Sequence, residues 1–170
     1  MNKLLLLGMA TMALLAAAVT SFAQAPAWTS PGSAGATLDE TSLGLYAVNP
    51  PNNTCLTFKP AKFGKIEARY DVVNTAVPST PVPPWNTFEL GYVAPLPSTV
   101  TATLYRVFPC TGQRVQICQV VGDNSPNPVC KTCTFAPSFN YITELYMVEV
   151  TLSRPEGAPP PQVCTLRVFN

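Results

Sequence analysis

Residues 99–108, with the sequence TVTATLYRVF, indicate the fold class of this chain most clearly. Val100, Ala102 and Leu104 alternate with Thr101 and Thr103, so an extended chain places apolar side chains on one side and hydroxyls on the other. Threonine, valine and tyrosine are also frequent in strands. The segment therefore predicts a β-strand that is buried on one side only.

Similar short alternations, separated by turn sequences, cover most of the chain after residue 37. Strands are predicted over residues 38–48, 55–58, 66–72, 88–92, 99–108, 114–121, 130–135, 141–153 and 163–169. Proline-rich loops at 78–84 and 156–161 and a turn at 123–128 lie between them. The pattern predicts an all-β protein: one antiparallel β-sandwich, immunoglobulin/fibronectin-III-like, with eight or nine strands and stapled by disulfides.

The first 23 residues have the features of a secretory signal peptide. Lys3 precedes an apolar run over residues 4–19, and Ser21 and Ala23 form a small-residue cleavage site before Gln24. Residues 24–36 are rich in Pro, Gly, Ser and Ala and are predicted to form a flexible arm. Residues 37–170 are expected to form the single sandwich domain, in a protein that is secreted, periplasmic or on the cell surface.

All six cysteines follow the signal peptide, and an oxidising compartment favours disulfides. Positions in the predicted strands suggest the pairs Cys55–Cys164 and Cys110–Cys118, which leave Cys130 with Cys133. Spacing alone does not settle the pairing. Two alternatives stay open: a redox site at the CxxC of residues 130–133, and a thiolate metal site that adds Cys110 and Cys118.

Several function classes are disfavoured by composition. The chain has no histidine, which removes Ser-His-Asp and Cys-His catalysis. It also lacks a P-loop, a nucleophile elbow and a dinucleotide fingerprint. Ten basic residues oppose nine acidic ones, so no nucleic-acid partner is expected, and no second apolar run is long enough for a membrane span. We predict a protein that is not an enzyme and has no cofactor and no metal.

Two features remain as candidate ligand-binding residues. Trp85 lies in a proline-flanked segment, where an exposed indole would bind carbohydrate or protein; the alternative is that it caps the core. The basic residues Lys59, Lys62, Lys65 and Arg69 lie among aromatic residues and form either a ligand contact or an ordinary solvated face.

The low proportion of charged residues, 11%, and the proline-rich loops suit packing against other proteins. The predicted function is a structural or adhesive subunit of a bacterial cell surface or extracellular assembly. Its partners would be other extracellular or envelope proteins, self-association included. The alternatives are an extracellular glycan- or protein-binding module and an exported CxxC redox or metal-binding protein.

Overall fold

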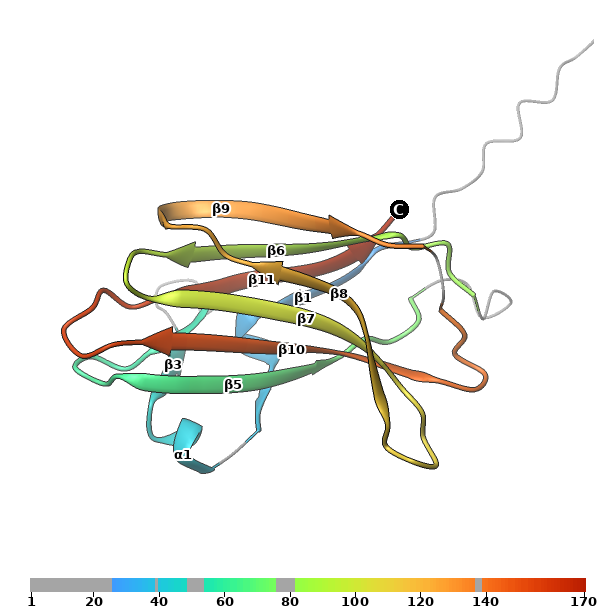
Figure 1. The fold of residues 1–170 in the computed structure, drawn as a ribbon, viewed down its shortest axis with the longest axis horizontal. Coiled ribbons are helices and arrows are strands. Elements are labelled where there is room, and N and C mark those ends of the chain that lie inside the picture. Colours follow the sequence, from blue (N-terminus) through green and yellow to red (C-terminus); the bar gives the residue numbers. More distant parts are fainter. Residues whose placement is uncertain (1–25, 39, 49–53, 76–81, 137–138) are drawn as a thin grey trace, which may run out of the picture.

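The computed structural model describes residues 26–38, 40–48, 54–75, 82–136 and 139–170. They form two antiparallel sheets packed face to face (Figure 1). One sheet has the order β3 (Tyr46–Val48), β4 (Leu56–Phe58), β11 (Gln162–Phe169), β6 (Thr87–Ala94) and β9 (Ser125–Thr134), with β1 (Trp28–Pro31) also paired to β11. The other has the order β2 (Ala36–Thr37), β5 (Gly64–Asp71), β10 (Leu145–Arg154), β7 (Thr99–Val107) and β8 (Arg114–Val121). The predicted all-β antiparallel sandwich is confirmed.

The connections give this sandwich the strand order of a jelly roll. From β4 to β11 the chain changes sheet at every step except the β7–β8 hairpin, so the sheets contain β4-β11-β6-β9 and β5-β10-β7-β8. Eight strands that cross between two sheets in this way form two Greek keys. The order differs from the immunoglobulin arrangement. Local alternation predicts each strand but does not say which sheet it joins.

Three predicted strands differ from the structure by more than two residues at one end. Residues 38–48 contain a short helix, α1 (Glu40–Leu43), before β3. Strand β9 begins at Ser125 and so includes part of the expected turn, because an edge strand tolerates Pro126 and Pro128 without a full ladder of N–H donors. Residues 141–143 form a turn, and β10 begins at Leu145.

The segment expected to be a flexible arm lies on the sandwich. Trp28 is buried and pairs with Val168 through β1, so the predicted flexibility of residues 28–31 is wrong. A short 3-10 helix, η1 (Gly32–Ala34), follows, and a side chain at Gly32 would lie only 1.8 Å from the Val163 carbonyl oxygen. The Tyr70 hydroxyl donates to the Gly32 carbonyl at 2.5 Å. The predicted signal peptide, residues 1–23, lies outside the described residues.

The core lies between the sheets and follows the predicted alternation. Val100, Ala102 and Leu104 of β7 are fully buried, as are Phe88 and Leu90 of β6 on the facing sheet. At the end of the sandwich where β10 begins, aromatic rings continue the core: Trp85, Phe135, Phe139, Tyr141 and Tyr146. Within the described residues, no helix has the length and apolar character that crossing a membrane requires.

Candidate functional site

The outer face of the five-stranded sheet carries a set of polar side chains that point away from the core. Val148 and Val150 of β10 are buried. Glu149 and Thr151 alternate with them along the strand and therefore point outward. The register places Glu149 opposite Thr103 of β7 and Arg69 of β5. Side chains from three adjacent strands therefore meet on one outer face.

A hollow of about 290 Å³ lies on this face, and we call it the polar hollow. Its lining consists of Leu38, Glu67, Thr101, Thr103, Tyr105, Arg114, Gln119, Glu149, Val150 and Thr151. Thr103 is only 5% exposed although it points outward, which shows that taller neighbours surround it. Gln119 of β8 lies opposite Thr103, and its Nε2 donates to the Thr103 Oγ1 at 3.0 Å. The floor of the hollow is thus a preformed set of hydroxyl and amide groups.

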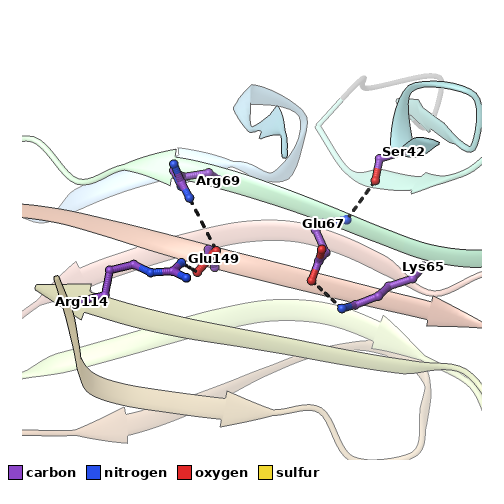
Figure 2. Close-up of polar contacts among 6 residues, drawn as sticks. All are labelled: Ser42, Lys65, Glu67, Arg69, Arg114 and Glu149. Atoms are coloured by element: carbon purple, nitrogen blue, oxygen red, sulfur yellow. Dashed lines mark hydrogen bonds and ion pairs between the residues drawn. The ribbon is translucent and has the colours of Figure 1, made fainter. Parts of the chain in front are cut away.

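Charged side chains at the polar hollow are held in ion pairs (Figure 2). The Glu149 carboxylate lies between two guanidinium groups: that of Arg69, with 3.7 Å between the closest atoms, and that of Arg114, which donates to it. Lys65 and Glu67 form a second pair at 2.5 Å. The Arg114 guanidinium also lies over the Tyr105 ring, 5.4 Å from its centre. These contacts restrain the side chains, and the three basic groups face two carboxylates, which leaves one positive charge in excess.

The predicted basic cluster is divided between two places. Lys65 and Arg69 lie on the outer face of β5, on either side of Glu67. Lys59 and Lys62 lie in the loop between β4 and β5, where the Lys59 Nζ is 3.5 Å from the Leu43 carbonyl. Of these four residues, Arg69 contacts the lining of the polar hollow through Glu149, and Lys65 contacts it through Glu67.

Trp85 does not form an exposed platform. The side chain is fully buried, its ring packs edge-on against Phe139 with 5.3 Å between ring centres, and its Nε1 donates to the Pro26 carbonyl at 3.1 Å. Its predicted role in binding a ligand is therefore corrected to the alternative, a residue that closes one end of the core. Flanking prolines are typical of an exposed loop. The indole nevertheless packs inward, because its large apolar surface is stabilised by burial.

Sequence reasoning named none of the ten lining residues of the polar hollow as ligand-binding, and those missed include Thr103, Tyr105, Arg114, Gln119 and Glu149. One signal was present, since the alternating threonines and tyrosine of residues 99–108 predict a polar outer face on that strand. What could not be found was β10, which pairs with β7 on the side opposite the β7–β8 hairpin. Glu149 is 46 positions from Thr103 in the sequence and directly opposite it in the sheet.

The cysteines form two disulfides among the described residues. Cys55 is bonded to Cys164, as predicted, and Cys118 is bonded to Cys133. Cys110 and Cys130 are free and exposed. The predicted Cys110–Cys118 and Cys130–Cys133 pairs are therefore wrong.

Strand geometry explains the observed pairing. Cys130 and Cys133 are an odd number of positions apart on β9, so their side chains point to opposite faces. Cys133 instead bonds to Cys118 of β8, which joins the edges of the two sheets. The bonded Cys133 leaves no free CxxC dithiol, and no group of three or more potential metal-ligating side chains occurs in the described part of the chain.

This pairing predicts the number of free thiols. Unfolded protein that has not been reduced should react with two equivalents of a thiol reagent, at Cys110 and Cys130. Peptide mapping after labelling checks the positions. A count of zero, or labelling at Cys118 or Cys133, would contradict the observed connectivity.

Comparisons with known proteins find likeness only in structure. No family model and no curated protein matches the sequence. One similar solved structure is of carbohydrate-binding modules from the β-sandwich superfamily: TM-score 0.48, 12% identity, covering 85% of this chain and 57% of that one. This chain thus spans little more than half of that protein.

Two further solved structures are similar over most of both chains. A xylan-binding domain of carbohydrate-binding module family 22 has a TM-score of 0.43 and 10% identity, covering 89% of this chain and 90% of that one. A family 11 module from Clostridium thermocellum, in complex with a β-1,3-1,4-mixed-linked tetrasaccharide, has a TM-score of 0.42 and 4% identity, covering 89% and 92%. What each of these modules binds is a property of that protein.

Proposed function

We propose that this protein is a secreted, non-catalytic binding module that holds a neutral glycan in the polar hollow. The observation that carries the proposal is the lining itself: threonine hydroxyls, a glutamine amide, two carboxylates and a guanidinium within one hollow of about 290 Å³. A sugar offers many hydroxyl groups that both donate and accept hydrogen bonds, and this lining supplies partners for both roles.

The arrangement of the polar groups favours a ligand of defined shape. Thr101, Thr103 and Thr151 lie on two adjacent strands whose register keeps their hydroxyls at fixed spacing. Ion pairing with Arg69 and Arg114 restrains Glu149, so less side-chain entropy is lost when a ligand binds. The Tyr105 ring adds a flat apolar surface beside these groups, and sugar rings have an apolar face of their own.

The charge distribution favours a neutral glycan over an anionic one. Lys65 is paired with Glu67, and Arg69 and Arg114 share Glu149. An acidic polysaccharide would need a surplus of positive charge over a wide surface, whereas ten basic residues oppose nine acidic ones in the whole chain. Both carboxylates of the hollow, Glu67 and Glu149, lie in ion pairs. They are suited to accept hydrogen bonds from a sugar, whereas glycoside cleavage needs a carboxylic acid that donates a proton.

A role as a structural or adhesive subunit that binds other proteins stays a prediction. Strand addition would need an open sheet edge, and β9 is such an edge among the described strands. Pro126 and Pro128 lie in its first half and lack N–H donors. Prolines at an edge disfavour the addition of another strand.

Replacing Glu149 with glutamine tests the proposal. Glu149→Gln removes the charge that holds Arg69 and Arg114 and the strongest acceptor of the polar hollow, so affinity for a bound neutral glycan should fall about 10- to 100-fold. Binding is screened on an array of neutral and acidic glycans and then measured by calorimetry.

The matched control is Glu89→Gln on the other sheet. Glu89 pairs with Arg167 at 3.1 Å and its side chain is 17% exposed, against 19% for Glu149. This variant should bind as the unaltered protein does. Equal losses in the two variants, or binding confined to acidic glycans, would refute the assignment of the site.

A further inference from the structure

A second hollow, of about 360 Å³, lies where β5 ends and β10 begins, and we call it the apolar hollow. Val72 and Val73 line it on one side, and Leu145 and the rings of Tyr141 and Tyr146 on the other. Val73 and Leu145 are each 57% exposed, which is a large exposed fraction for aliphatic side chains that lie together. A ligand that covers them would remove this apolar surface from water.

The hydroxyls of the two tyrosines at the apolar hollow are engaged in hydrogen bonds within the protein. The Tyr141 hydroxyl donates to the Val72 carbonyl at 3.0 Å, and the Tyr146 hydroxyl accepts from the Asn140 N–H at 2.6 Å and donates to Glu144. Burial raises the pKa of both hydroxyls above the ordinary value, so both stay uncharged at neutral pH. Five of the seven lining residues are thus aliphatic or aromatic, and Asp71 and Asn74 complete the lining.

The two hollows share the outer side of β10. Leu145 borders the apolar hollow and Glu149 borders the polar hollow, and both point outward from this strand. Four residues of strand separate them by about 13 Å. Met147 lies between them, opposite Tyr105 of β7 and Asp71 of β5. A molecule that reaches both hollows must therefore cross the position of Met147, which is 7% exposed.

We propose that the ligand is an amphiphilic glycoside, with a neutral sugar in the polar hollow and an alkyl or aryl aglycone in the apolar hollow. The inference rests on the proposed function and adds the chemical class of the aglycone attached to the sugar. Asp71 lies at the boundary of the apolar hollow, and its carboxylate disfavours an acidic lipid there. Neutral glycosides meet no such repulsion.

Paired glycosides test the inference. The probes are the methyl and octyl β-glycosides of glucose, galactose and xylose, used below the concentration at which the octyl compounds form micelles. For at least one sugar, both forms should perturb the NMR signals of Thr103 and Gln119. The octyl form should in addition perturb the methyl signals of Val73 and Leu145. Each buried methylene strengthens binding by up to about fourfold, so the octyl form should bind at least about tenfold more tightly than the methyl form.

The outcomes separate this inference from the proposed function. If methyl glycosides bind at the polar hollow and octyl glycosides bind no more tightly, the aglycone site is refuted and the proposed function stands. If octyl glycosides perturb Val73 and Leu145 but leave Thr103 and Gln119 unchanged, the hollows act separately and the inference is refuted. If no glycoside perturbs either hollow, both the inference and the polar hollow as a site for these sugars are refuted.

A variant pair checks the aglycone contact itself. Leu145→Ser should lower the ratio of octyl to methyl affinity at least threefold, because it removes apolar surface from the apolar hollow. Leu43→Ser is the matched control, since Leu43 is 52% exposed and does not line either hollow. Equal ratios in the two variants would contradict the contact, and the NMR test on the unaltered protein decides the inference without any variant.

Discussion

Replacement of Trp85 by alanine is expected to lower the free energy of unfolding by about 3–5 kcal/mol. The indole is fully buried at the end of the sandwich and packs against Phe139 and Tyr141, with ring centres 5.3 Å and 6.5 Å away. Its removal leaves a cavity and also leaves the Pro26 carbonyl without the donor that now lies 3.1 Å away. Denaturant unfolding, followed by circular dichroism, measures the loss.

The control for this variant separates packing from hydrogen bonding. Trp85→Phe retains an aromatic ring but not the N–H donor. It should therefore lower the free energy of unfolding by clearly less than Trp85→Ala does. If Trp85→Ala lowered the free energy of unfolding by less than about 1 kcal/mol, Trp85 would behave as a surface residue, contrary to its position in the core. The result therefore also decides between the two interpretations of this tryptophan that the sequence left open.

Removal of the Cys55–Cys164 disulfide is the second large effect that we expect. The bonded residues are 109 positions apart, and the chain-entropy model gives about 4.7 kcal/mol for a loop of roughly this size. The bond ties the segment before β4 to β11, the strand on which β1, β4 and β6 all pair. The Cys55→Ser and Cys164→Ser double variant should therefore unfold at markedly lower denaturant concentration.

The Cys118–Cys133 bond provides the comparison within the same protein. Its residues are 15 positions apart, for which the same model gives about 3 kcal/mol. The Cys118→Ser and Cys133→Ser double variant should thus lose about 1.7 kcal/mol less than the first one. Equal losses, or a larger loss for the shorter loop, would show that native contacts rather than loop closure govern the stabilisation.

The β-sandwich could be predicted because its signal is local. Alternation in residues 99–108 reports which side of the strand is buried, and the structure places Val100, Ala102 and Leu104 in the core as expected. Where the prediction was wrong, pairing with a strand that is distant in the sequence determined the local structure. Trp28 belongs to a segment with the composition of a flexible arm, yet it forms a strand because β11 offers it an unpaired edge.

The candidate site was predicted only in part, for the same reason. The outward direction of Thr101 and Thr103 follows from the alternation, and Arg69 was singled out among basic residues. The glutamate that pairs with Arg69 comes from β10, 80 positions away in the sequence. Gln119, whose amide donates to Thr103, lies on β8, the next strand in the sequence, but local alternation does not give the hairpin register that places it opposite Thr103. Nothing local to Glu149 distinguishes it from other acidic residues in strands.

The sequence by itself determined most of the strands of this protein and which side of them is buried. It also determined the absence of histidine chemistry, because these properties depend on residue identity and on neighbours one or two positions away. Only the tertiary structure decided which strands pair, which cysteines bond, that Trp85 is buried, and that Thr103, Gln119 and Glu149 line one hollow. The physical reason is that strand order and register depend on contacts between distant segments, which local alternation does not specify.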